Sequence, residues 1–144
     1  MIKTQRNTMG TLKINWLAIV AATIVAQAIS AGLYGAFAEQ WMSYHKLDKA
    51  FIDANFSTTP FIVSIIASVT LYYIMAMVFK RMNIRTLTDG LKWGALMGLA
   101  FGFLGPYTQG HFEFNVYSGI LDGSNNFLGI LAGGIILGAW IKTD

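Results

Sequence analysis

Four long apolar stretches constrain the fold of this chain more than any other feature. They cover residues 14–38, 57–79, 87–109 and 118–141. Each is about as long as the ~20 residues that an α-helix needs to cross a bilayer. Only 12% of the side chains are charged and 55% are hydrophobic, which leaves little for a soluble surface. The pattern predicts an all-α, integral membrane bundle of four transmembrane helices, with the lipid bilayer as its partner.

The four stretches, their connections and short tails use up the sequence, so we expect residues 1–144 to form a single transmembrane domain. The run from Ile14 to Ala38 exceeds the ~7–15 residues of a signal-peptide core, which favours a retained first helix. The chain contains no cysteine, which excludes disulfides and thiol chemistry.

The flanking charges predict an orientation. With the N-terminus inside, most acids lie outside and eight of the ten Lys and Arg lie inside: Lys3, Arg6, Lys13, Lys80, Arg81, Arg85, Lys92 and Lys142. Cytoplasmic loops carry such an excess. We therefore expect both termini on the cytoplasmic side of the membrane. The net charge of +3 then reflects orientation, and no nucleic-acid partner is expected.

Local signals predict where individual helices begin and end. Thr59 followed by Pro60 is typical of a cap and first turn, which would start the second helix at Pro60. Thr86 and Asp89 resemble a capping box at the start of the third. Pro106 is expected to kink that helix or end it just after Leu104.

The connection of about twenty residues between the first two helices is long for a helix pair. Its apolar side chains recur at helical spacing between charged ones: Trp41, Tyr44, Leu47, Phe51 and Ile52. This favours a short interfacial amphipathic helix over an ordered loop with aromatic anchors.

Small residues recur at intervals of four within the helices. Such rows let helix backbones approach closely in lipid, where packing replaces the hydrophobic drive. We expect helix packing at Ala22, Ala26, Gly32, Gly94, Gly98, Gly102, Gly129, Gly133, Gly134 and Gly138. Packing within one bundle and contacts in a homo-oligomer or larger membrane complex are both consistent with the rows.

Polar residues inside the apolar stretches are binding candidates, because an unpaired polar group is costly in hydrocarbon. Gln27 and Tyr34 share a face of the first helix, and Asp122 and Asn126 share one of the fourth. Interhelical hydrogen bonding and ligand contact both explain the first pair. Asp122 is expected to act as an N-cap or in binding.

Acids and histidines gather on the expected outer side, where Glu39, His111 and Glu113 join Asp122 as binding candidates. His45 lies there too. Imidazole and carboxylate groups serve metal binding, proton relay and recognition of cations. However, His111 and Glu113 lack the spacing that directs two ligands at one ion. No metal site, catalytic residue or cofactor is predicted, since no catalytic motif is recognisable.

Several short motifs resemble a known family. They are Asn15-Trp16-Leu17, Gly32-Leu33-Tyr34 with Phe37, Trp41-Met42 and the closing run from Gly134 to Trp140. They look like the small bacterial membrane proteins known as domain of unknown function 1761. The resemblance covers most of the chain and implies a four-helix inner-membrane protein. It implies no established activity, catalytic residue or cofactor.

Three functions remain open from the sequence. The first is an accessory or assembly subunit that packs through its glycine- and alanine-rich faces. The second is a small oligomeric transporter or permeation unit, which predicts that Gln27, Tyr34 and Asp122 line one cavity. The third is a membrane enzyme, which predicts that His111, Glu113, Glu39 and Asp122 converge on the outer side.

Overall fold

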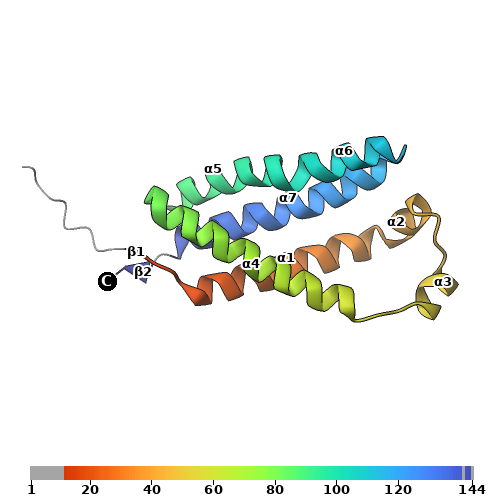
Figure 1. Cartoon of the computed structure of the whole chain (residues 1–144), viewed down its shortest axis with the longest axis horizontal. Coiled ribbons are helices and arrows are strands. Elements are labelled where there is room, and N and C mark those ends of the chain that lie inside the picture. The colour runs from red at the N-terminus through yellow and green to blue at the C-terminus, as the bar shows by residue number, and fades with distance from the viewer. Residues whose placement is uncertain (1–11, 141, 144) are drawn as a thin grey trace, which may run out of the picture.

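The computed structural model describes residues 12–140 and 142–143, and it is all-α apart from one two-residue strand pair. Long helical rods run side by side along one axis (Figure 1). The rods are α1 (Trp16–Ala36), α4 (Thr59–Met82), the joined rod α5 (Leu87–Met97), η1 (Gly98–Phe103) and α6 (Leu104–Phe112), and α7 (Val116–Ala139). The helices therefore fall where the four apolar stretches predicted them.

Three of the rods, α1, α4 and α7, are long and apolar enough to cross a membrane. The rod from residue 87 to 112 is of similar length, 26 residues, but is divided between α5, η1 and α6. Many more of the large hydrophobic side chains are exposed than are buried, as expected where lipid is the solvent. The chain is therefore a multi-pass membrane protein that associates with a lipid bilayer.

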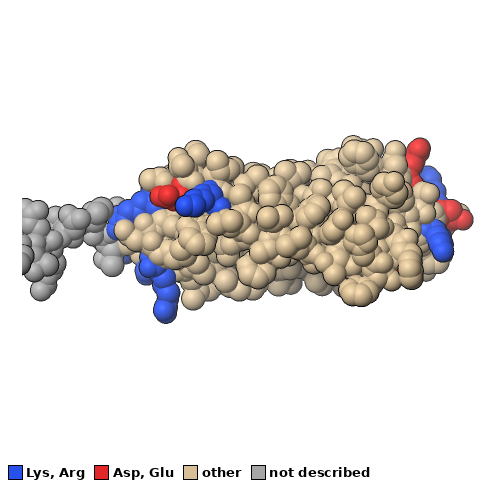
Figure 2. Space-filling model, turned by 90° about the horizontal axis from the view of Figure 1, so that it is seen from above, with Lys and Arg blue, Asp and Glu red and all other residues tan. Residues whose placement is uncertain are grey.

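Charged side chains lie at the two ends of the rods and leave the middle of the visible face free (Figure 2). Lys and Arg gather at the end where β1 (Leu12–Lys13) pairs with β2 (Lys142–Thr143). The far end carries acids together with lysines. Lys3 and Arg6, which entered the predicted charge asymmetry, lie outside the described residues.

The β1–β2 pair joins the start and the end of the described chain. Leu12 lies opposite Thr143 in an antiparallel register. Asn15 caps α1 with its side-chain oxygen, and its Nδ2 donates to the Trp140 carbonyl at 3.0 Å. The sequence pattern did not predict this pairing, since two residues carry no strand periodicity.

The third rod continues past Pro106, so of the two predicted alternatives, a kink or an end after Leu104, the end is wrong. The segment Gly98–Phe103 is a π-helix, and α6 then runs through the proline to Phe112. Proline lacks the N–H for one ladder bond, and its ring crowds the carbonyl four residues earlier. The π turns immediately before the proline are wider than α turns and shift the pattern of backbone hydrogen bonds there. The helix can therefore continue through Pro106.

The connection between α1 and α4 is helical, as predicted, but it holds two short helices, so the prediction that it forms one helix is wrong. They are α2 (Ala38–Tyr44) and α3 (Lys49–Ala54). Lys46 between them has φ of 55°, and the Asp48 side chain accepts a hydrogen bond from the Phe51 N–H at 2.7 Å. A left-handed residue followed by an N-cap stops one helix and starts another.

Helix starts were predicted with mixed success. The Thr86–Asp89 cap is confirmed, because the Asp89 N–H donates to Thr86 Oγ1 at 3.0 Å and that hydroxyl donates to Asp89 Oδ2 at 2.8 Å. The predicted cap at Thr59 is wrong, because α4 already begins at Thr59, whose N–H donates to the Ser57 hydroxyl.

The N-cap role considered for Asp122 is also wrong, because α7 begins at Val116, and Asp122 lies two turns inside the helix. Asn115 is the N-cap there.

Helix α7 is the centre of the bundle and packs against every other rod. The core gathers between α1, α4 and α7, where Ile19, Tyr72 and Met75 are buried. Helix α4 packs on α1 and α7, whereas no extended contact joins α4 to α5, η1 or α6. The bundle therefore leaves a gap in its packing between α4 and η1, above the surface of α7.

Candidate functional site

Polar side chains on successive turns of α1 form hydrogen bonds to the neighbouring helices. Gln27 Nε2 donates to the hydroxyls of Ser64 and Ser68 on α4 at 3.2 and 3.1 Å. The hydroxyl of Ser30 donates to Asn125 Oδ1 on α7 at 2.9 Å. The face of α1 that the sequence indicated is therefore a line of interhelical hydrogen bonds.

The outermost bond on this line joins Tyr34 to Asp122. The Tyr34 hydroxyl donates to Asp122 Oδ1 at 2.7 Å. It ties α1 to α7 one turn outside Ser30 and Asn125.

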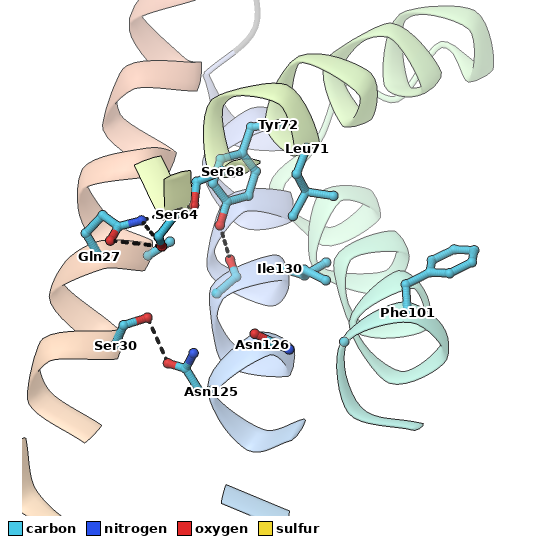
Figure 3. A pocket seen from close by; sticks show the side chains of 13 residues that line it. Gln27, Ser30, Ser64, Ser68, Leu71, Tyr72, Phe101, Asn125, Asn126 and Ile130 are labelled. Carbon is cyan, nitrogen blue, oxygen red and sulfur yellow. Dashed lines mark hydrogen bonds between the residues drawn. The ribbon is translucent and has the colours of Figure 1, made fainter. Parts of the chain in front are cut away.

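A cavity of about 290 Å³ lies beside this line, near the middle of the rods. Its side walls come from α1, α4 and η1, and α7 forms its floor (Figure 3). We call it the central cavity. Besides Tyr72, six amide and hydroxyl side chains line it: Gln27, Ser30, Ser64, Ser68, Asn125 and Asn126. Among the described residues that line it, none is charged or histidine, so its chemistry suits an uncharged, hydrogen-bonding group.

Tyr72 forms the fixed inner wall of the central cavity. Its side chain is 1% exposed, and its hydroxyl donates to the Gly129 carbonyl at 2.8 Å. The ring lies so close to Gly133 that a Cβ there would overlap it. Glycine at this turn of α7 is therefore required for Tyr72 to reach the floor of the cavity.

A second cavity, of about 450 Å³, lies at the end of the rods that carries α2. We call it the outer cavity. It is lined by His45, Gln109, Glu113, Ser118 and Asp122, with backbone from α6 and α7. Unlike the central cavity, it contains two carboxylates and an imidazole.

Ser118 links two of these groups. Its hydroxyl lies 3.3 Å from His45 Nε2 and 3.5 Å from Asp122 Oδ2. His45 Nδ1 is 2.9 Å from the Trp41 carbonyl. A carbonyl oxygen only accepts, so Nδ1 of His45 carries a proton. Polar contacts thus extend from the outer cavity through Asp122 to Tyr34.

The family model described as protein of unknown function (DUF1761) matches residues 17–138. The chain belongs to this family. The match confirms the resemblance inferred from the sequence motifs. No curated protein and no solved structure matches the chain.

In this DUF1761 chain the binding candidates from the sequence divide between the two cavities. Gln27 and Asn126 line the central cavity, and Glu113 and Asp122 line the outer one. Tyr34 lines neither, and instead bonds Asp122 between them. The cavity shared by Gln27, Tyr34 and Asp122 that a transporter was expected to have is therefore not found.

Glu39 and His111 lie apart from the outer cavity lining. His111 contacts the Tyr107 ring edge-on, with centroids 4.7 Å apart, and both candidates are exposed. Within the described part of the chain no three His, Asp or Glu side chains could share a metal ion. The convergence that a membrane enzyme was expected to show is therefore incomplete.

The glycine rows face α7 or lie on it. A Cβ on Gly94 would lie 3.1 Å from the Gly134 Cα, and one on Gly138 would lie 2.6 Å from the Gly90 Cα. Close contacts of this kind also involve Gly98, Gly102 and Gly133, whereas Gly129 has only ordinary van der Waals neighbours. Ala22 and Ala26 are buried in the core.

Gly32 differs from the other small residues expected to pack. A Cβ there would meet nothing within 4 Å. The packing expected at this position is absent within the described chain, because Gly32 is two residues from both Ser30 and Tyr34, which bond to α7, and so lies on the opposite face of α1.

Sequence reasoning left Ser64, Ser68 and Ser118 out of the candidate site. Ser64 and Ser68 are four residues apart in an otherwise apolar helix, which places them on one face. The same argument, polar side chains that share one face of an apolar helix, identified Gln27 and Tyr34. Ser118 is four residues from Asp122 and shares its face of α7, so the same signal was present there, whereas His45 reaches Ser118 only through the fold.

Proposed function

We propose that this chain is a small transport or permeation protein whose central cavity holds an uncharged, hydrogen-bonding part of its substrate. The observation that carries the proposal is the convergence of six uncharged polar side chains from α1, α4 and α7 at mid-depth. Binding sites in transporters commonly lie near the bilayer midplane, beside interrupted helices. The π-helical η1 on the cavity wall supports the comparison.

We further propose that the rod α5–η1–α6 is a fourth transmembrane crossing and that the whole chain acts as one unit. Both ends then lie in the cytoplasm, and the outer cavity faces away from it, in a bacterial inner membrane. The basic end at β1 and β2 supports this orientation. A reporter fused after Asp144 should be active only in the cytoplasm, and periplasmic activity would contradict the orientation.

A chemical test of the central cavity uses the absence of cysteine from the chain. Ser68→Cys places a thiol in the cavity lining. Thr70→Cys is the matched control on the same helix, since Thr70 is exposed and its hydroxyl bonds only to the Ile66 carbonyl of α4. Both variants are reconstituted into vesicles and treated with methyl methanethiosulfonate or with its charged trimethylammonium-ethyl analogue.

We expect the cavity cysteine to react with the uncharged reagent, and at least about tenfold more slowly with the charged one, because a charge is costly at this depth. The control cysteine should react with neither, since a thiol in hydrocarbon stays protonated. If Ser68→Cys is as unreactive as Thr70→Cys, the cavity is dry and the proposal is wrong.

A second candidate is an accessory or assembly subunit, as a homo-oligomer or in a larger membrane complex. Most of the glycine rows pack within the chain, but the face of α1 around Gly32 and Gly35 is open. That face supports contact with another helix. Gly32→Cys should then form a disulfide-linked dimer under oxidation in native membranes, whereas Gly105→Cys on α6 should not. A monomer in both cases would exclude a symmetric contact at this face.

A further inference from the structure

We infer that the substrate of the central cavity is amphipathic, with a small uncharged head held by the polar wall and a hydrocarbon chain that leaves between α4 and η1 into the bilayer. The inference rests on the proposed function and names the class of substrate. Three observations support it: an unpartnered amide, a cavity with two chemically different sides, and a lateral gap in the packing.

Asn126 is the polar group that requires explanation. It lies ten residues into α7, about 15 Å along the helix, which is near mid-membrane. Its side chain is exposed, lines the central cavity and forms no hydrogen bond within the described chain. An amide at this depth without a protein partner must be satisfied by a group inside the cavity. A ligand that both donates to it and accepts from it does so.

The central cavity has a polar side and an apolar side. Gln27, Ser30, Ser64, Ser68 and Asn125 lie toward α1, whereas Leu71, Ile130 and Phe101 lie toward η1 (Figure 3). Asn126 lies between the two groups. A wholly polar solute would place polar groups against the apolar side, and a wholly apolar one would leave the amides unpaired. An amphipathic molecule satisfies both sides.

The apolar side opens sideways rather than toward either end of the rods. Helix α4 has no extended contact with η1, and Phe101 at the edge of the gap is 74% exposed. At this depth the surroundings of the rods are hydrocarbon. The opening therefore allows an acyl or isoprenoid chain to remain in the bilayer while its head occupies the cavity.

The head is further limited by charge and size. The described lining contains no charged side chain, so a phosphate, carboxylate or ammonium head would be buried without a counterion. A cavity of about 290 Å³ is at the lower end of small-molecule sites. Hydroxyl, ester and amide heads of about the size of glycerol fit these limits.

The test uses a photoactivatable monoacylglycerol, with a diazirine near the head of its acyl chain, in vesicles that contain the purified protein. Mass spectrometry locates the cross-links. A photoactivatable fatty acid with the same chain is the charged comparison. Unlabelled monoolein and free glycerol are the competitors.

The variants are Leu71→Trp, which fills the lateral opening, and Ser64→Ala with Ser68→Ala, which removes two hydroxyls. Their matched controls are Leu99→Trp on η1 and Thr70→Val on α4, both exposed and outside the lining.

We expect cross-links at the cavity lining that monoolein displaces and glycerol does not, with weaker labelling by the fatty acid. Leu71→Trp should reduce the yield at least about tenfold by blocking the opening. The double serine variant should reduce it about fivefold, the effect of one lost hydrogen bond of about 1 kcal/mol. The two controls should match the unmodified protein.

Labelling spread evenly over the lipid-facing surfaces, or unchanged in Leu71→Trp, would overturn the inference, since it reports ordinary surrounding lipid. Displacement by glycerol as effective as by monoolein would also overturn it but would leave the proposed function standing. Cross-links between two copies at the same lining residues would overturn it in favour of a neighbouring helix. Failure of the Ser68→Cys labelling would instead remove the proposed function itself.

Discussion

The two sides of α7 show two different ways of joining helices in lipid. Against α5, glycine faces glycine, and the backbones approach so closely that no side chain fits between them. Against α1 and α4, the contact at mid-depth is made by amides and hydroxyls that reach across a space. Packing through small residues leaves no cavity, whereas bridging by polar side chains preserves one. The first side is suited to rigidity and the second to binding.

The largest loss of stability is expected where the glycines of α5 and α7 meet. Gly134→Val adds a branched side chain where a Cβ alone would lie 2.6 Å from the Gly94 Cα. Overpacking of this kind costs about 3 kcal/mol, and the chain should unfold at lower temperature in mild detergent. Gly105→Val is the control, because nothing lies within 4 Å of a Cβ there. Equal melting of the two variants would contradict the rigidity of this interface.

A smaller loss of stability is expected at Tyr72 of α4, whose ring packs against Gly133 of α7. Tyr72→Phe removes the hydroxyl that donates to the Gly129 carbonyl and leaves that carbonyl without its side-chain donor. The free energy of unfolding should fall by about 1 kcal/mol. Tyr73→Phe, whose ring stacks on Trp16 and whose hydroxyl makes no hydrogen bond in the described chain, should have no measurable effect. A melting curve for each variant distinguishes them.

Tyr34→Phe tests the polar contact between α1 and α7. Its expected loss in the free energy of unfolding is smaller still, about 0.6 kcal/mol. It removes the bond to Asp122 that lies between the two cavities. Asn126→Cys should therefore react faster with an impermeant thiol reagent added outside when Tyr34→Phe is also present. Tyr117→Phe, exposed on α7, is the control. An unchanged rate would show that this bond does not separate the cavities.

The smallest effect is expected for Gly32→Ala. No atom of the described residues lies within 4 Å of the new Cβ, and alanine is the better helix former. The isolated protein should therefore melt at an equal or slightly higher temperature. A clear loss of stability, measured in native membranes but not in dilute detergent, would reveal a helix from another copy on this face.

The sequence alone determined the membrane character of the chain and the positions of its long helices, because apolar length and helical spacing are local properties. The Thr86–Asp89 cap was predictable for the same reason. The break between α2 and α3 at Lys46 was not, since it depends on a left-handed residue that no strong local preference requires.

Only the tertiary structure decided which helices touch through glycine and which enclose space. Rows of small residues occur on both α1 and α7, and the sequence does not say which of them meet a neighbour. Gln27 and Asn126 were recognisable as costly polar groups in hydrocarbon, but their separation from Asp122 was not. That separation depends on the register of α1 against α7, which is set by side-chain contacts between residues about ninety positions apart.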